Sequence, residues 1–315
     1  MGMMSGSNLC PRNHVKEITS SLVALSVARY VDNNHCGPMP DRREFLTTAA
    51  LSVLGIKTAL PTRLTVDGPI GLQLYTLRSE MKRSFSRTLE RVRRAGYTEV
   101  EFAGYFGHSP RSIRGTLDAN GLTAPAAHIS LDDMATRWER TIADAATIGH
   151  RYLVCAWIDD EYRTADGYRR IADRFNRAAD LARRSGIGFG YHNHTYEFKR
   201  IDNTTGYDIL LAESDAENVA MELDVFWMRQ AGLDALRYLT RFPGRYRMLH
   251  LKDMGPPPAN AMVDVGKGVI DWRPLLTVAR QQRIAHLFVE HDEPKDGFAS
   301  IRSSYRFLRE LRIGV

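Results

Sequence analysis

Eight short apolar runs alternate with longer helical stretches from residue 69 onward, and this alternation constrains the fold more than any other feature of the sequence. The runs cover residues 70–75, 99–103, 124–129, 152–158, 187–192, 219–225, 248–252 and 287–290. Short apolar runs predict buried strands, and the 3.6-residue period of the stretches between them predicts helices. Such alternation is typical of parallel strands joined by helical crossovers.

The stretches between the runs carry the signals of helix ends as well as a helical period. Residues 79–95 and 166–185 are expected to be helices. In the second of these, the predicted buried face consists of Ile171, Phe175, Ala178 and Leu181. Glycines expected in the left-handed conformation follow four helical stretches, at Gly96, Gly121, Gly149 and Gly186. Ser109-Pro110 predicts a further helix start, with a cap followed by proline.

Eight strand–helix units in about 245 residues match a closed barrel. An open, doubly wound sheet is the competing architecture, but no Gly-x-Gly-x-x-Gly follows the first strand. The chain has 315 residues, 43% of them hydrophobic, which is ordinary for a globular enzyme. No apolar run reaches 18 residues, so no stable membrane insertion is expected. We therefore predict an α/β fold, a single (β/α)8 TIM barrel over residues 61–315.

Residues 1–60 are expected to form a leader outside the barrel. They show no sustained period until Asp41-Arg42-Arg43-Glu44-Phe45-Leu46, which precedes a mildly apolar stretch over residues 47–60. Paired arginines before such a stretch resemble a twin-arginine export signal. This predicts a periplasmic location. The alternatives are an amphipathic surface helix and a cytoplasmic protein.

Net charge and cysteine content bear on nucleic-acid binding and on disulfides. The net charge is +6, without a dense Lys/Arg run, and this does not argue for nucleic-acid binding. Of the three cysteines, only Cys155 falls in the barrel region, so a disulfide within that domain is impossible. Cys155 lies in an apolar run and is expected to be a small core residue.

Ionisable and aromatic side chains gather where the predicted strands end, and active sites of such barrels lie at those ends. They are Tyr75, Glu101, His128, Trp157, His192, His194, Glu197, Asp224, Trp227, His250, Lys252 and Glu290. Asp224, His250 and Glu290 are flanked by apolar residues, where a charge is costly unless it is paired or metal-bound. Singly, each has a structural explanation as a helix cap or hydrogen-bonded core residue. Together, carboxylates and an imidazole on neighbouring strands suit one Mn²⁺, Mg²⁺, Co²⁺ or Zn²⁺ ion.

Six motifs occur in order on the predicted strands and loops. They cover residues 71–78, 191–198, 223–227, 250–253, 265–272 and 289–290. With them the chain resembles the xylose-isomerase-like barrel superfamily, in its group of sugar phosphate isomerases/epimerases, from about Gly68 to the C-terminus. The resemblance implies one metal ion held by four residues, here Glu197, Asp224, His250 and Glu290, with His192 as the alternative to Glu197 because it stands closer to the strand end. Many relatives have Glu where Lys267 stands, at a position that would face the substrate.

The resemblance implies enolate chemistry on a keto-sugar, with the metal as Lewis acid. The candidate acids and bases are Glu197 and Glu290, in the family's roles, with His128, His192 and His194. Lys252 is expected to stabilise a developing oxyanion or to form a salt bridge with Asp253 at the barrel rim. The candidate substrate-binding residues are Tyr75, Glu101, Trp157 and Trp227, of which the aromatic ones are alternatively ordinary barrel packing.

Three functions stay open from the sequence. The first is a metal-dependent isomerase, epimerase or lyase acting on a keto-sugar, polyol or 3-keto-glycoside. The others are a metal-dependent endonuclease on the same barrel and a barrel that binds sugar without turnover. No glycine-rich phosphate cradle precedes a helix after the last two strands, and export would place the enzyme where sugar phosphates are scarce. We therefore expect an unphosphorylated small-molecule substrate, no nucleic-acid partner and an undetermined oligomeric state.

The leader is expected to contribute little to the stability of the barrel, because it lacks a sustained apolar period. A variant that lacks residues 1–60 should therefore melt within a few degrees of the full chain when both are followed by circular dichroism. A large fall in melting temperature would show that the leader packs on the barrel.

Overall fold

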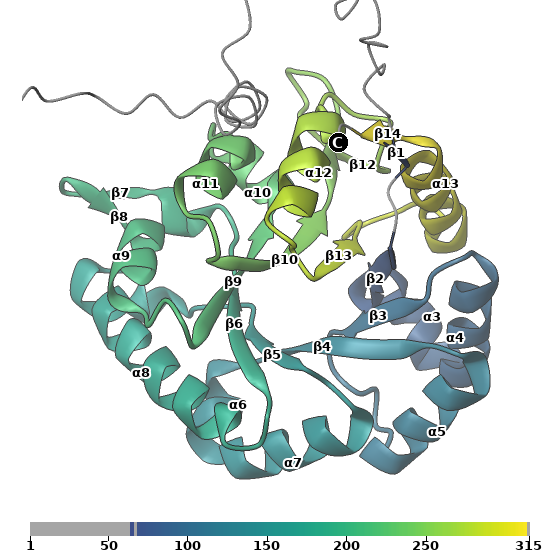
Figure 1. The fold of residues 1–315 in the computed structure, drawn as a ribbon, viewed down its shortest axis with the longest axis horizontal. Helices are drawn as coiled ribbons and strands as arrows, with labels where there is room; N and C mark the ends of the chain where they lie inside the picture. Colours follow the sequence, from purple (N-terminus) through teal and green to yellow (C-terminus); the bar gives the residue numbers. More distant parts are fainter. Residues whose placement is uncertain (1–63, 66–67, 314–315) are drawn as a thin grey trace, which may run out of the picture. The chain divides into compact units, whose positions relative to one another are not determined.

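The computed structural model describes residues 64–65 and 68–313, and its centre is a closed barrel of eight parallel strands (Figure 1). In chain order these are β2 (Gly71–Gln73), β3 (Glu99–Phe102), β4 (Thr123–Ile129), β5 (Tyr152–Cys155), β6 (Gly188–His192), β9 (Val219–Asp224), β10 (Tyr246–Leu251) and β13 (His286–Val289). Each strand pairs with the next in this order, and β13 pairs with β2 to close the barrel. All eight predicted strands are present, which confirms the (β/α)8 barrel and excludes the open sheet.

Helices cover the outside of the barrel (Figure 1). They are α3 (Arg78–Arg83), α4 (Phe85–Arg94), α5 (Pro110–Asn120), α6 (Leu131–Thr136), α7 (Trp138–Ile148), α8 (Ala165–Arg183), α9 (Gly206–Glu213), α10 (Val225–Gln230), α11 (Ala235–Arg241), α12 (Trp272–Gln281) and α13 (Gly297–Glu310). The helix expected over 79–95 is two helices, because Ser84 takes extended angles between α3 and α4. Leu181 was wrongly placed on the buried face of α8. It is exposed, and Ala182 continues that face instead.

The predicted helix ends are confirmed. Ser109 caps α5 by accepting a hydrogen bond from the Ser112 amide, and Pro110 is the first helical residue. The four predicted glycines all have positive φ, between 60° and 112°. Three two-stranded antiparallel sheets lie apart from the barrel sheet: β1 (Leu64–Thr65) with β14 (Arg312–Ile313), β7 (Arg200–Ile201) with β8 (Thr204–Thr205), and β11 (Asp253–Met254) with β12 (Met262–Val263). Within the described residues, no helix is long and apolar enough to span a membrane.

Apolar side chains fill the middle of the barrel, and a layer of polar side chains lies next to them at the carboxyl ends of the strands. Ala126, Val154, Met248 and Phe288 form a separate buried cluster. Side chains alternate across a strand, so the residues two positions further on face the same way. Those residues are His128 after Ala126, His250 after Met248 and Glu290 after Phe288. Cys155 is fully buried, as expected. The leader and the predicted export signal lie outside the described residues.

A buried histidine before the start of β5, away from the carboxyl ends of the strands, makes the stability of the fold pH-dependent. His150 is 4% exposed, and its Nδ1 donates a 2.6 Å hydrogen bond to the Ala124 carbonyl. Its Nε2 is buried without a partner. Burial lowers the pKa of His150 to about 4. The folded state therefore binds fewer protons here than the unfolded state between about pH 6.5 and pH 4, and stability falls as the pH falls through that window.

We expect the free energy of unfolding to fall by roughly 2 kcal/mol from pH 7.5 to pH 5 because of His150 alone. Urea unfolding of the chain and of His150→Gln across this range isolates the contribution, since other titrating groups are common to both. The variant should show the shallower pH dependence. Parallel curves for the two proteins would contradict the assignment.

Candidate metal-binding active site

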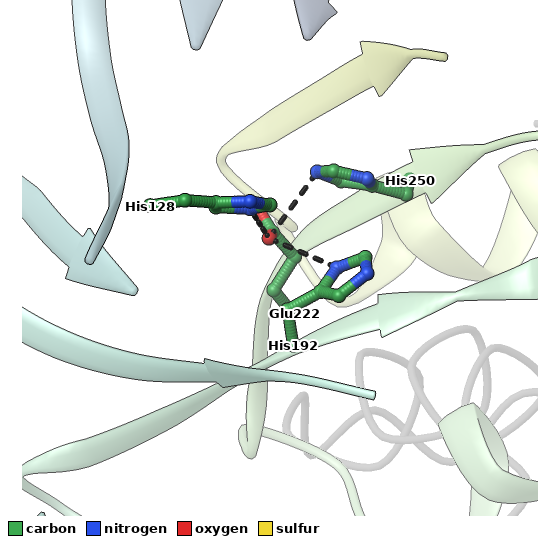
Figure 2. A group of neighbouring side chains, drawn as sticks. All are labelled: His128, His192, Glu222 and His250. Atoms are coloured by element: carbon green, nitrogen blue, oxygen red, sulfur yellow. Dashed lines mark hydrogen bonds and ion pairs between the residues drawn. The ribbon is translucent and has the colours of Figure 1, made fainter. Parts of the chain in front are cut away.

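Three histidine rings surround one carboxylate oxygen at the carboxyl ends of the barrel strands (Figure 2). The oxygen is Oε2 of Glu222 on β9. It lies 2.9 Å from Nε2 of His128, 3.2 Å from Nδ1 of His192 and 3.2 Å from Nε2 of His250. These histidines come from β4, β6 and β10, and only the His128 side chain is partly exposed. We call these four residues the inner group.

Glu101 supports the inner group from β3. Its Oε2 lies 2.6 Å from Nε2 of His250 and accepts a 2.8 Å hydrogen bond from the Gln73 amide. Gln73 and Glu101 are both fully buried. Glu101, expected to bind substrate, thus contacts a histidine and a glutamine inside the barrel. The structure does not place it on the cavity wall described below.

Three of the four predicted metal ligands also come together. Asp224, His250 and Glu290 each offer one ligand atom, and these atoms lie within 4.8 Å of one another. Nδ1 of His250 is 2.7 Å from Oε2 of Glu290 and 4.0 Å from Oδ2 of Asp224. We call these three residues the outer group. His250 belongs to both groups and presents a different ring nitrogen to each.

Lys252 lies among the carboxylates of the outer group. Its ammonium is 3.2 Å from Asp224, 2.9 Å from Glu290 and 2.9 Å from Asp292. Burial alone would lower the pKa of Lys252, but these three negative charges outweigh it and raise the pKa. The lysine is therefore a fixed positive charge at the floor of the site.

The alternative salt bridge between Lys252 and Asp253 is wrong, because Asp253 holds the glycine motif. Its Oδ2 accepts hydrogen bonds from the Gly266 amide, the Gly268 amide and the Trp272 indole. A Cβ atom at Gly268 would clash with this carboxylate, which explains the glycine. Lys267, between the two glycines, is exposed and paired with Asp264 at 2.7 Å. The motif thus anchors the loop after β10 and does not direct Lys267 toward the cavity.

The structure does not bring Glu197 together with the other predicted ligands. It lies in the short helix η3 (Tyr196–Phe198), and its Oε1 accepts hydrogen bonds from the Tyr191 hydroxyl at 2.5 Å and the His194 amide at 2.8 Å. Tyr191 packs against Phe175 of α8, on the opposite side of β6 from His192. Glu197 is therefore buried between the barrel and its helices. Burial raises its pKa to about 7.

Asp224 is a helix cap and a member of the outer group at once. Its Oδ1 accepts from the Trp227 amide at the start of α10, and its Oδ2 faces Lys252. Asn193 accepts from the Asp224 amide at 3.0 Å and donates to the Asp224 carbonyl, which ties the end of β6 to the end of β9. Burial raises the pKa of Asp224 to about 6.

A cavity of about 470 Å³ opens above these groups. Seven of the predicted site residues line it: Tyr75, His128, Trp157, His192, His194, Lys252 and Glu290. The rings of Tyr75 and Trp157 are 40% and 48% exposed, so both offer apolar surface to a bound molecule. Trp227 is not on the cavity wall, and its ring lies against His194 and under the Lys252 ammonium.

His194 is an uncharged member of the cavity wall. Burial, followed by the positive charge of Lys252, lowers its pKa to about 3. Its Nδ1 is buried without a hydrogen-bond partner. The ring stacks on Tyr196 and meets the edge of Trp157. The aromatic rings thus hold a neutral imidazole on the wall of the cavity, where it can contact a bound molecule.

Sequence reasoning missed Glu222, Gln73 and Asp292. A signal for Glu222 was present, since it stands two residues before Asp224 on the same strand and must face the same side. Gln73 is the last residue of β2 and stands two residues after Gly71, so the two residues face the same side of the strand. Asp292 follows the strand end by several residues, and its pairing with Lys252 depends on how the loop returns.

The donor set fits a divalent cation. Glu101 Oε1, Glu222 Oε1 and Asp224 Oδ2 are buried carboxylate oxygens without hydrogen-bond partners. Lys252 is the one ammonium that the structure pairs with the carboxylates of the outer group. Buried charges of one sign are costly unless a counter-charge is close. Imidazole nitrogens and carboxylate oxygens at these separations are the ligands that Zn²⁺, Mn²⁺ and Co²⁺ take.

Residues 89–311 match the family described as the xylose isomerase-like TIM barrel. The chain belongs to this family. It is 24% identical over 231 residues to inosose dehydratase of Lacticaseibacillus casei, which covers 61% of this chain and 76% of that one.

Solved structures of the same fold extend the likeness. A sugar phosphate isomerase/epimerase from Parabacteroides distasonis is 26% identical, with a TM-score of 0.69 over 77% of this chain and 98% of that one. The IOLI protein, solved with a zinc atom, is 15% identical, with a TM-score of 0.60 over 76% of this chain and 96% of that one. This chain is thus similar to carbohydrate-modifying enzymes on the same barrel.

The geometry of the outer group predicts which variants lose metal. Asp224→Asn and Glu290→Gln should each lower the bound metal measured by inductively coupled plasma mass spectrometry, because each removes a charged ligand. Glu197→Gln should keep its metal, since Glu197 lies on the other side of β6. Metal loss in Glu197→Gln alone would restore that residue to the ligand set.

Proposed function

We propose that this chain is a divalent-metal-dependent enzyme that removes the proton next to the carbonyl of a keto-sugar or 3-keto-glycoside, with epimerase or lyase chemistry. The observation that carries the proposal is the outer group with Lys252, buried and opening onto an aromatic-walled cavity. Two carboxylates, an imidazole and an ammonium at one point are costly to bury without a function.

Asp224, His250 and Glu290 would hold the metal. When bound, it supplies Lewis acidity toward the carbonyl and neighbouring hydroxyl oxygens of the substrate. Neighbouring side chains hold these ligands in place through hydrogen bonds on the side away from the metal. Asn193 holds the Asp224 backbone, and Glu101 with Gln73 holds the far nitrogen of His250. Such outer contacts orient ligands and keep them in place.

Lys252 and His194 carry the remaining roles in this proposal. The Lys252 ammonium is fixed by three carboxylates and lines the cavity, so it donates a hydrogen bond to an oxygen that gains negative charge. His194 has an uncharged ring on the cavity wall, and we assign to it the removal of the proton from the carbon beside the carbonyl. His128 is already hydrogen-bonded to Glu222 and is less available for that transfer.

An uncharged sugar fits the cavity better than a sugar phosphate. Trp157 and Tyr75 offer flat apolar surfaces of the kind that pack on sugar rings. Asp133, Glu290 and Asp292 line the cavity, and carboxylates repel a phosphate. Three carboxylates offset the charge of Lys252, and Lys267 is paired with Asp264 and is not part of the cavity wall, so neither offers an uncompensated charge to a phosphate. The relatives support the reaction class, because one is named a dehydratase and another an isomerase/epimerase.

Export of the enzyme is part of the same proposal. The paired arginines Arg42 and Arg43 before an apolar stretch are typical of a twin-arginine signal. That pathway carries folded proteins, which suits a barrel whose site is completed by a metal. A periplasmic enzyme would meet glycosides and free sugars.

The substrate class is tested by a panel assay with Mn²⁺ or Co²⁺. We expect turnover of 3-keto-glycosides or free keto-sugars and little turnover of the corresponding phosphates. Metal-depleted protein is the control and should be inactive until the ion is returned. Turnover confined to phosphorylated compounds would overturn the proposal.

The role of His194 is tested by His194→Gln, which keeps the size and polarity of the side chain but cannot take a proton. We expect kcat to fall by about 10²-fold or more, with bound metal unchanged. Exchange of the substrate proton with deuterium from solvent should slow in parallel. A variant that exchanges deuterium at the normal rate would assign proton transfer to another group.

A further inference from the structure

We propose that the inner group is a second divalent-metal site, below the first and distinct from it. It consists of His128, His192, Glu222 and His250. The outer group on which the proposed function rests contributes only His250 to it. The second site therefore stands on its own observations.

The spacing of the inner group is that of ligands around a small ion. A tetrahedral site with bonds of about 2.0–2.1 Å places its ligand atoms about 3.3 Å apart. Oε2 of Glu222 lies 2.9, 3.2 and 3.2 Å from the three imidazole nitrogens. All four ligand atoms lie within 4.8 Å of one another. Figure 2 shows the three rings directed at this oxygen from three different strands.

Hydrogen bonds alone leave the inner group incomplete. Oε1 of Glu222 and Nδ1 of His192 are buried without a hydrogen-bond partner, and both residues are at most 2% exposed. Three imidazoles and one carboxylate oxygen in contact is also more than that oxygen's lone pairs accommodate well. A cation among the four ligand atoms would bind Nδ1 of His192 and Oε2 of Glu222 together with the other two imidazoles.

The two sites can be filled at once because His250 faces each with a different nitrogen. Its Nδ1 points to Glu290 of the outer group, and its Nε2 points to Glu222 of the inner group. Glu101 also approaches Nε2 at 2.6 Å, so a second carboxylate is available beside the inner site. To bind an ion through each nitrogen, His250 must lose its remaining N–H proton to solvent and bridge the two ions as an imidazolate.

The balance of charge also favours two ions. Five carboxylates meet within these groups and their direct neighbours: Glu101, Glu222, Asp224, Glu290 and Asp292. Lys252 is the ammonium paired with them, which leaves an excess of four negative charges when the histidines are neutral. One divalent ion halves this excess, and two ions bridged by a His250 imidazolate reduce it to one negative charge. Burial makes the difference large, because charge in the interior is poorly solvated.

The two sites should differ in the metal they prefer. The inner group has three nitrogen ligands and one oxygen ligand, a set that suits Zn²⁺ or Co²⁺. The outer group has two carboxylates and one imidazole beside an open cavity, a set that also accepts Mn²⁺ or Mg²⁺. The inner ion would be enclosed, with only His128 partly exposed, which is typical of a structural ion.

The test is the metal content of the full chain after depletion and reconstitution with Zn²⁺ or Co²⁺. We expect two ions per chain in the unmodified protein, one in Glu222→Gln and one in Asp224→Asn. Glu99→Gln is the matched control, because Glu99 on β3 is also a barrel-strand carboxylate beside a histidine, His286 on β13 at 2.9 Å, and within the described residues no hydrogen bond or ion pair joins it to either group. It should keep two ions.

His128→Gln provides a second variant if Glu222→Gln does not fold, since His128 is the least buried member of the inner group. In the Co²⁺ protein it should lose the absorption bands of the nitrogen-rich site and keep those of the outer site. One ion per chain in the unmodified protein, or two ions in both inner-group variants, would overturn the proposal. Metal content is measured without substrate, so a failure of the proposed function leaves this result standing.

Discussion

The excess of buried negative charge at the strand ends is the constraint on which the rest of the site depends. Glu101, Glu222 and Asp224 are fully buried, and Glu290 nearly so. Water cannot solvate them, so they depend on neighbouring side chains that supply a counter-charge or donate a hydrogen bond. Lys252 pairs with three carboxylates, His250 with four, and Gln73 donates a hydrogen bond to Glu101. The barrel tolerates this layer because the apolar layer below it supplies the packing.

That apolar layer and the polar layer are produced by the same property of the strands. Inward positions recur every second residue, so Met248 and His250 are successive rungs of one strand, as are Phe288 and Glu290. The first rung packs in the middle of the barrel and the second reaches the site. The outward positions between them, Leu249 and Val289, join the larger core under the helices. A single strand, β10, thus contributes Leu249 to the core under the helices, Met248 to the barrel interior and His250 to the site.

The barrel itself was predictable from the sequence because each strand is a short apolar run and each helix has its own period and caps. The site was predictable only where strand position decides the direction of a side chain, as it does for Asp224, His250 and Glu290. Glu197 lies five residues beyond the strand, in a turn whose course no periodicity describes. Glu222 stands two residues before Asp224 on β9, so the alternation of the strand places both carboxylates inward.

Glu197 shows why a carboxylate in a motif need not be a ligand. Its two hydrogen bonds join the outward face of β6, at Tyr191, to the backbone of His194 on the cavity wall. The two histidines of this segment then face different ways for different reasons. His192 is aimed inward by the strand, and His194 is aimed at the cavity by the turn that Glu197 closes. The motif therefore supplies His192 to the inner group and His194 to the cavity wall, and Glu197 fixes the turn between them. A change at Glu197 thus acts on the site through His194.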